Sequence, residues 1–262
     1  MDGGWGWGQP AAHLAVDSAA ELARASGVGL VTVRRCNHVG RLGEYVEKLS
    51  RGGLMSLIIC NARPAVAPYG GYTRLLGTNP IAWGAPQAEG TAPLVVDFAT
   101  AAIAEGKLKV AHAAGANAPP GAVVDKEGRP SDETAAFYDG GALMPFGGHK
   151  GFGLSVMAEL MGGVLSGTGA SAAPDFANGN GTAVLAIDVA RFMPAADFMR
   201  QAGALSDILH GAPKAPGFDE ILTPGEPEWR SRIQRSNDGI PIPAATHRAI
   251  SELASELGVR VT

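Results

Sequence analysis

Glycine and proline interrupt this chain at short intervals and so limit how long any helix or strand can run. The 262 residues include 37 glycines and 18 prolines. They fall between apolar segments and do not form one low-complexity tract. Because both residues favour tight turns and end regular elements, this spacing predicts a folded chain with many turns rather than a disordered one.

The composition excludes several classes of protein. Hydrophobic residues make up 46% and charged residues 18% of a chain long enough for one large or two modest domains. A net charge of −4 gives no general attraction to nucleic acid or to an anionic membrane. No apolar stretch approaches the roughly 18 residues of a membrane span. We therefore expect no nucleic-acid partner and no membrane.

The cysteines indicate a reducing compartment. Cys36 and Cys60 each lie beside an apolar run, and they do not form a C-x-x-C pair. The first ten residues lack the basic-then-apolar order of a signal peptide. Disulfide frameworks belong to secreted proteins, so this cysteine usage predicts a cytoplasmic location.

The first 60 residues alternate between helix and strand patterns. Helical apolar spacing over 11–26, including Leu14 and Leu22, is followed by a β-branched run at 28–33. A second helix at 42–49 and a second strand at 55–60 come next. This β-α-β order predicts two parallel neighbouring strands joined by a crossover. No G-x-G-x-x-G connects a strand to a helix, so the Rossmann phosphate loop is missing.

The rest of the chain has no internal repeat and no clear linker. Segments 64–86 and 115–145 are rich in turn residues. The expected elements are strands at 94–96 and 183–187 and helices at 101–114, 151–165, 195–209, 227–235 and 243–257. We expect a nucleotide-binding core at roughly 27–190, flanked by helical parts at 1–26 and 191–262.

Two residues at strand ends are candidates for proton transfer. His38 follows a buried strand, and an imidazole titrates near neutrality, so it can donate and accept a proton. The alternative is that His38 only caps the helix that follows. Asp97 ends an apolar strand, where a carboxylate can orient a histidine or bind a ribose hydroxyl. The alternative for Asp97 is the N-cap of its following helix.

A glycine-rich loop at 147–153 precedes the helix at 151–165 and contains His149 and Lys150. Glycines expose backbone N–H groups, and a helix N-terminus and Lys150 both favour anions. This pattern fits a cradle for a pyrophosphate or a carboxylate. The spacing is not that of a Walker A loop, and a solvated turn is the alternative. No His, Cys and Asp cluster has zinc spacing, so we predict no metal.

Read together, these segments resemble the malate/L-lactate dehydrogenase family, which is unrelated to the Rossmann-type lactate dehydrogenases. The similarity runs from near Gly4 to the C-terminus and looks closest to the hydroxycarboxylate dehydrogenase branch. It is carried by ordered motifs at 37–45, 66–71, 77–80, 96–100, 106–107, 125–130, 141–151 and 224–226.

The resemblance implies a non-Rossmann α/β fold with a mixed, largely antiparallel sheet flanked by helices, assembled as a homodimer. It implies NAD or NADP as cofactor and interconversion of a small 2-oxo acid and its 2-hydroxy acid. His38 would be the proton donor and acceptor, with Asp97 as the candidate that orients it. The implied cofactor contacts are Gly77, Thr78, Asn79, Asp97, Phe98, Ala99, His149, Lys150, Gly225 and Glu226.

The sequence departs from the family pattern in three places. Family members carry an N-terminal helical segment with a Ser-His-Gly motif, and no Ser-His-Gly occurs here. Ala101 stands where a serine often follows the Asp-x-Ala-Thr motif, and Ser131-Asp-Glu133 replaces Thr-Asp-Pro. The alternative function is therefore that of a truncated or degenerate homologue that binds nucleotide or a partner subunit without catalysis.

Overall fold

The computed structural model describes residues 1–260 and divides into two compact units. The first unit is Met1–Gly225, and the second begins at Glu226. The sequence suggested no boundary there and placed 191–262 in one flanking part. The structure instead keeps residues up to Gly225 with the main body, where the Val95 N–H of the main sheet donates to the Pro224 carbonyl at 3.1 Å.

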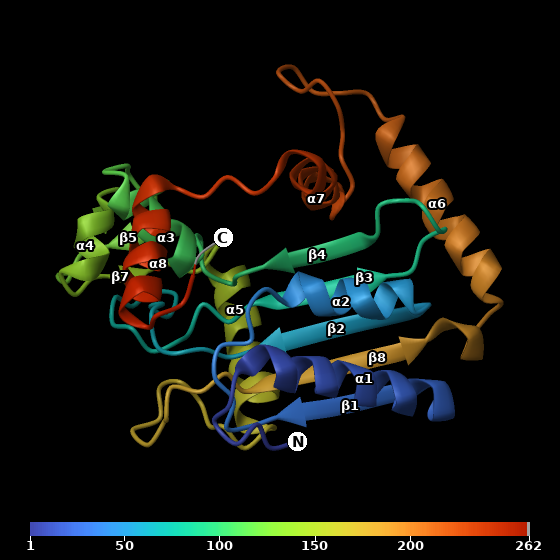
Figure 1. Ribbon diagram of the computed structural model, residues 1–262, viewed down its shortest axis with the longest axis horizontal. Coiled ribbons are helices and arrows are strands. Elements are labelled where there is room, and N and C mark those ends of the chain that lie inside the picture. Colours follow the sequence, from blue (N-terminus) through green and yellow to red (C-terminus); the bar gives the residue numbers. More distant parts are fainter. Residues whose placement is uncertain (261–262) are drawn as a thin grey trace. The chain divides into compact units, whose positions relative to one another are not determined.

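The first unit is built on a five-stranded sheet (Figure 1). Its order is β1-β8-β2-β3-β4, and every neighbouring pair is antiparallel. The strands are β1 (Val28–Val33), β8 (Thr182–Asp188), β2 (Leu54–Cys60), β3 (Ile81–Ala85) and β4 (Leu94–Phe98). This topology confirms the expected α/β fold with an antiparallel sheet outside the Rossmann class.

The expectation that the first two strands are neighbours is wrong. β1 and β2 run parallel to each other, but β8 lies between them, with Val184 opposite both Val31 and Ile58. A strand from much later in the sequence therefore fills the position between them, which local pattern could not reveal. The structure also adds β3 within 64–86, a segment for which the sequence indicated many turns and no strand.

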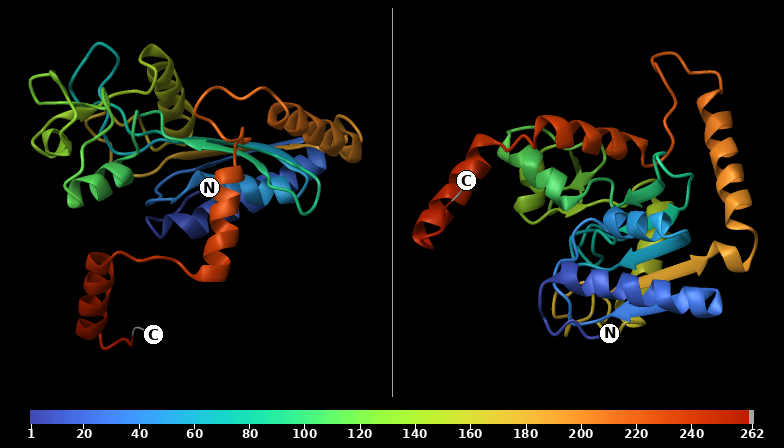
Figure 2. Two further views of the ribbon diagram at one scale, coloured as in Figure 1. Left: turned by 90° about the horizontal axis from the view of Figure 1, so that it is seen from above. Right: turned by 45° about the vertical axis from the view of Figure 1, so that its right-hand side comes forward.

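Helices cover both faces of this sheet (Figure 2, left). α1 (Gly8–Ser26) and α2 (Leu42–Arg51) lie on one face, and α5 (His149–Ala158) lies on the other. The π-helix η1 (Glu159–Val164) continues α5, where a single helix to residue 165 was expected. A change to i→i+5 hydrogen bonding shifts which side chains face the sheet.

α1 reaches the sheet through alanines. Ala12, Ala15, Ala19 and Ala23 are buried, whereas Leu14 and Leu22 of the expected apolar stripe are 58% and 47% exposed. A Cβ on Gly29 of β1 would lie 2.2 Å from the carbonyl oxygen of Ala19. Such close packing of helix on strand leaves room only for small side chains, which explains why the leucines point outward.

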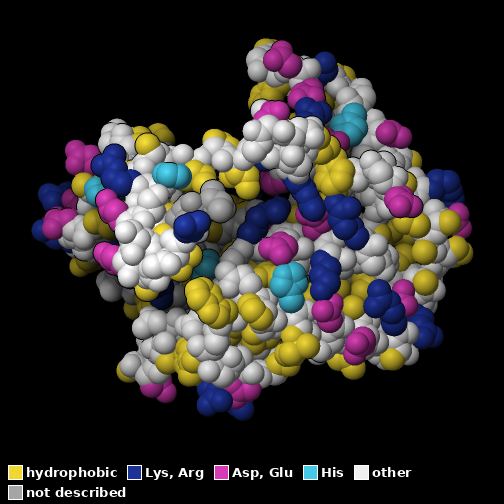
Figure 3. Space-filling view, viewed as in Figure 1, with side chains coloured by type: hydrophobic (Ala, Val, Ile, Leu, Met, Phe, Trp, Pro, Cys, Tyr) yellow, Lys and Arg dark blue, Asp and Glu magenta, His cyan; other side chains and the backbone are white. Residues whose placement is uncertain are grey.

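The outer side of α1 and α2 carries charges of both signs (Figure 3). His13 lies 3.0 Å from Glu44, and Lys48 pairs with Asp17 at 2.6 Å. These pairs are exposed, so each contributes little to stability. The face in view has no single-sign patch over these two helices, in agreement with the modest net charge.

A smaller lobe of the first unit has its own core. The three-stranded sheet β6-β5-β7 packs with α3 and α4 around Leu108, Val123, Phe137 and Leu143. The elements are α3 (Glu105–Ala113), β5 (Val123–Val124), β6 (Pro130–Ser131), α4 (Thr134–Tyr138) and β7 (Ala142–Leu143). The helix expected at 101–114 is present as α3, whereas the sequence predicted mostly loop at 115–145 because two-residue strands carry no recognisable period.

The remaining helices follow the expected boundaries closely. A 3₁₀ turn at Val189–Arg191 leads into α6 (Ala195–His210), which belongs to the first unit. The second unit contains α7 (Glu226–Asp238) and α8 (Ala244–Glu256). Across residues 1–260, no helix combines the length and the apolar character that crossing a membrane would require.

Candidate functional site

Most of the predicted site residues gather at one edge of the main sheet. β1, β2 and β4 end at this edge, and β3 and β8 begin there (Figure 1, left side of the sheet). We call this side of the sheet, where strands end and begin, the site edge. It receives the loop with His38 after β1, Asp97 near the end of β4, and the Gly77–Asn79 turn before β3. Antiparallel pairing thus assembles segments that are far apart in sequence.

The loop that carries His38 is anchored by one of its side chains and by its backbone. The Asn37 side-chain amide donates to the Trp5 carbonyl at 2.7 Å and to the Gly6 carbonyl at 3.1 Å. The Asn180 backbone N–H donates to the Cys36 carbonyl at 2.8 Å. His38 itself is exposed. The loop is therefore fixed while its histidine remains open to a ligand.

Two buried contacts hold the other side of this loop. The Tyr45 hydroxyl of α2 donates to the Val39 carbonyl, and burial raises the pKa of Tyr45 to about 12. A Cβ on Gly8 would lie 2.2 Å from the His38 carbonyl oxygen, so the start of α1 can touch the loop only at a glycine. His38 therefore sits beside the first turns of both α1 and α2.

Asp97 caps a helix, although not the one that follows it in sequence. Its Oδ2 accepts a hydrogen bond from the Gly43 N–H at 2.8 Å and lies 3.5 Å from Arg41 Nε. Both partners belong to the start of α2. A carboxylate near a helix N-terminus is stabilised by the unpaired N–H groups there. The orienting role of Asp97 toward His38 remains a prediction.

The Gly77–Asn79 turn is shaped by Asn79, which is fully buried with φ of +41°. Its amide nitrogen donates to Ser155 Oγ at 2.9 Å and to Glu159 Oε1 at 2.8 Å, and its oxygen accepts from the Ala62 N–H at 3.1 Å. The hydrogen-bonding atoms of the Asn79 side chain are thus occupied by partners inside the protein. A cofactor contact from this turn would come from Thr78 or from the backbone.

Sequence reasoning missed Glu159. This buried carboxylate also accepts from the Asn61 amide at 3.1 Å and from the Ser171 N–H at 2.8 Å. One signal was available, because Glu159 is the only charged residue between positions 151 and 165. A carboxylate among apolar helix residues needs hydrogen-bond partners if it is to be buried.

The start of α5 fits an anionic group. Gly147 and Gly148 have φ of +55° and +63°, a conformation that side chains rarely adopt. Within the described residues, the N–H groups of Gly148 and His149 donate no hydrogen bond. Lys150 is exposed beside them. These groups suit the negatively charged pyrophosphate of a nicotinamide dinucleotide.

Backbone hydrogen bonds join three predicted cofactor segments. The Thr100 N–H donates to the Thr78 carbonyl at 2.9 Å, and the Phe146 N–H donates to the Thr100 carbonyl at 3.0 Å. Phe98 packs edge-on against Phe146, with ring centroids 5.3 Å apart. The structure therefore brings 77–79, 97–99 and the start of α5 with His149 and Lys150 into one neighbourhood.

The predicted contact Gly225 does not join this group. Gly225 lies at the other end of β4, where a Cβ would be 2.5 Å from the Pro93 carbonyl oxygen and 3.0 Å from the Val95 nitrogen. Glu226 begins α7 in the second unit. Their roles toward a cofactor remain predictions.

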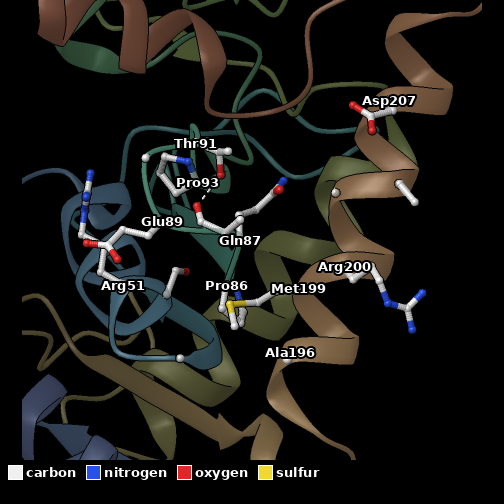
Figure 4. A pocket seen from close by; sticks show the side chains of 16 residues that line it. Arg51, Pro86, Gln87, Glu89, Thr91, Pro93, Ala196, Met199, Arg200 and Asp207 are labelled. Atoms are coloured by element: carbon white, nitrogen blue, oxygen red, sulfur yellow. Dashed lines mark hydrogen bonds between the residues drawn. The ribbon is translucent and has the colours of Figure 1, made fainter.

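A cavity of about 1070 Å³ lies at the opposite edge of the sheet (Figure 4). It is bordered by the end of α2 with Arg51, by the β3–β4 loop with Glu89, and by α6 with Met199 and Asp207. None of the predicted site residues lines it. Its size alone is therefore no argument that the reaction takes place there.

The whole chain is similar to known dehydrogenases. The family described as malate/L-lactate dehydrogenase matches residues 1–251. The L-lactate dehydrogenase of Cupriavidus necator is 39% identical, covering 100% of this chain and 77% of that protein. The L-sulfolactate dehydrogenase of Methanocaldococcus jannaschii is 36% identical, covering 100% and 76%.

Solved structures agree with this similarity. The malate dehydrogenase of Entamoeba histolytica superimposes with a TM-score of 0.94 at 28% identity, covering 99% of this chain and 77% of that one. The malate dehydrogenase from Pyrococcus horikoshii gives a TM-score of 0.89 at 31% identity, covering 100% and 74%. The motifs quoted from the sequence, the antiparallel sheet and these relatives all lead to one conclusion: the chain belongs to the malate/L-lactate dehydrogenase family.

Proposed function

We propose that this protein is an NAD(P)-dependent oxidoreductase that interconverts a small 2-hydroxy acid and its 2-oxo acid. Family membership supports hydroxy-acid dehydrogenase activity. The observation that carries the proposal is the site edge, where an exposed histidine on an anchored loop shares an edge with an anion-binding helix start. Acid–base chemistry and dinucleotide binding both need such groups near each other.

Each group has a chemical task in this proposal. The nicotinamide, when bound, accepts or donates the hydride at the carbon that bears the oxygen. His38 takes the hydroxyl proton during oxidation and returns it during reduction, because an imidazole ring nitrogen can both accept and donate a proton. The N–H groups of Gly148 and His149, together with Lys150, bind the negative charge of the cofactor.

We also propose that the protein works as a homodimer in the cytoplasm. One face of the main sheet leaves Val28, Leu30, Met55 and Trp83 between 36% and 48% exposed. Apolar surface of this kind supports association with a second copy. Both cysteines are free and buried, which supports a reducing compartment. Sedimentation showing only monomer at micromolar concentration would argue against the homodimer.

The proposed function is tested by an activity screen with both cofactors. L-lactate, L-malate and L-sulfolactate are oxidised with NAD⁺ and with NADP⁺, and formation of the reduced cofactor is followed by absorbance. We expect turnover of at least one acid. NAD(P)H binding is measured in parallel by fluorescence. Binding without turnover of any acid would support the non-catalytic homologue, and absence of both would overturn the assignment.

A further inference from the structure

Glu159 is a buried acidic group that the proposed chemistry does not use. It is 5% exposed at the start of the π-helix η1. Within residues 1–260, none of the ion pairs includes it. A buried carboxylate without a cationic partner is strongly unfavourable unless hydrogen bonds replace its water. The hydrogen-bond donors around its two oxygens must therefore explain how Glu159 can be buried.

Four N–H donors from three separate segments converge on this carboxylate. Oε1 accepts from the Asn79 amide at 2.8 Å and from the Gly77 N–H at 3.3 Å. Oε2 accepts from the Ser171 N–H at 2.8 Å and from the Asn61 amide at 3.1 Å, with the Ser171 hydroxyl at 3.0 Å. The carboxylate thus ties the helix to the turn before β3, the end of β2 and the loop before β8.

These bonds complete a closed circuit through the site edge. From Glu159, the circuit passes to the Gly77–Asn79 turn and, through the Thr78 carbonyl, to Thr100. It continues from the Thr100 carbonyl to Phe146, whose own carbonyl accepts from the Gly151 N–H of α5 at 3.0 Å. α5 then leads back to Glu159 along the helix axis. The circuit includes the turn at 77–79 and the helix start with Lys150.

We propose that Glu159 is a positioning residue for the cofactor. By fixing the Gly77–Asn79 turn against α5, it sets the spacing between the turn and the anion-binding helix start. This inference rests on the proposed function, because it takes those segments to contact NAD(P). The inference adds that Glu159, which does not itself contact the cofactor, determines how tightly the turn and the helix start bind it.

The charge of Glu159, and not only its shape, is required by the donor pattern. Glutamine has nearly the same size, but one of its two side-chain ends is an NH₂ group that can only donate. Each carboxylate oxygen of Glu159 faces N–H donors, so a glutamine in either orientation would oppose donor to donor. Displacing a positioning contact by a small distance can weaken ligand interactions strongly.

The test variant is Glu159→Gln, and Val46→Ala is the control for a general loss of stability. Val46→Ala removes a buried side chain from the core beneath α2, outside the circuit. Thermal unfolding is measured for both variants, and the dissociation constants of NADH and NADPH are measured by fluorescence titration. We expect Glu159→Gln to weaken cofactor binding by about tenfold or more. Val46→Ala should lower the unfolding temperature and leave the dissociation constant unchanged.

Kinetics separate positioning from general damage. For Glu159→Gln, the cofactor KM should rise, whereas kcat at saturating cofactor should fall much less. Ser171→Ala provides a milder change. It removes the hydroxyl that lies 2.6 Å from the Ala62 carbonyl oxygen and 3.0 Å from Oε2, and it should raise the dissociation constant by less than Glu159→Gln does. If Glu159→Gln does not fold, the cofactor dissociation constant of Ser171→Ala tests the inference instead.

Two results would overturn the inference in distinguishable ways. Unchanged cofactor affinity in folded Glu159→Gln or Ser171→Ala, with a wild type that binds, would show that Glu159 is only structural. A wild type that binds neither NADH nor NADPH would refute the proposed function, and this inference would fail with it.

Discussion

The two edges of the main sheet differ in how they are built. At the site edge, loops from distant parts of the chain are joined by buried hydrogen bonds and by glycines that permit backbone contact, as at Gly8 and Gly77. At the opposite edge, α6 and the β3–β4 loop border a cavity of about 1070 Å³, where Gln87 reaches across to Ser206 at 3.1 Å.

This difference shows that open space and chemical organisation can lie in separate places. The cavity offers open space, but the charged Arg200 on its α6 side pairs within its own helix, with Asp197 at 2.9 Å. The site edge instead holds its polar groups in fixed positions and leaves His38 and Lys150 exposed. Preorganised groups, and not volume, are what catalysis and dinucleotide binding require.

The largest expected effect is that of His38→Ala at the site edge. Loss of a general acid and base should lower kcat by about 10²- to 10⁴-fold, with cofactor affinity nearly intact. Steady-state kinetics on a substrate found in the screen, together with fluorescence titration, measure both quantities. Wild-type turnover would place the proton donor elsewhere. Weakened cofactor binding with normal kcat would identify His38 as a cofactor contact.

Lys150→Ala tests the anion-binding part of the same edge. Removing the ammonium at the start of α5 should weaken NAD(P)H binding by about 10- to 100-fold, the effect of one lost charge-assisted contact. Fluorescence quenching gives the dissociation constant. Lys109→Ala, an exposed lysine on α3, is the control and should bind as the wild type does. Equal affinity in both variants would reject the role of Lys150.

Tyr45→Phe tests the packing beneath the His38 loop. It leaves the buried Val39 carbonyl without its hydroxyl donor, so the free energy of unfolding at neutral pH should fall by about 1–3 kcal/mol. Urea denaturation measures this loss. An unchanged free energy of unfolding would mean that water replaces the phenol and that the loop is held by its other contacts.

The same variant has a signature in alkaline solution. In the unfolded state tyrosine loses its proton near pH 10, whereas burial keeps the folded pKa at about 12. The unfolded state then binds fewer protons, so wild-type stability should fall as pH rises above 10. Tyr45→Phe should lose less over this range. The fall due to buried Cys60, whose pKa is also raised to about 12, is common to both proteins.

The smallest effect is expected at the opposite edge. Gln87→Ala removes the hydrogen bond to Ser206 and should lower the free energy of unfolding by about 1 kcal/mol or less. Cofactor affinity should stay at the wild-type value, since no predicted cofactor residue lines the cavity. A weaker dissociation constant for NAD(P)H in this variant would break the distinction between the two edges.

The family, the class of fold and most helices could be predicted from the amino-acid sequence alone. Motifs such as those at 37–45 and 141–151 are local, and helices follow from short-range periodicity, so they can be recognised without knowing what they contact. The candidates His38, Asp97 and Lys150 came from the same local signals. The structure places His38 in a loop, Asp97 near the end of β4 and Lys150 in the first turn of α5, all at the site edge.

The pairing of distant segments, in contrast, could be seen only in the folded chain. β8 lies between β1 and β2, and Asp97 caps α2. Glu159 accepts hydrogen bonds from three separate segments. These contacts join residues far apart in the chain, and their hydrogen bonds form only once the intervening segments have folded back on each other. Local periodicity reports which face of an element is apolar, but it carries no information about which distant group will meet that face.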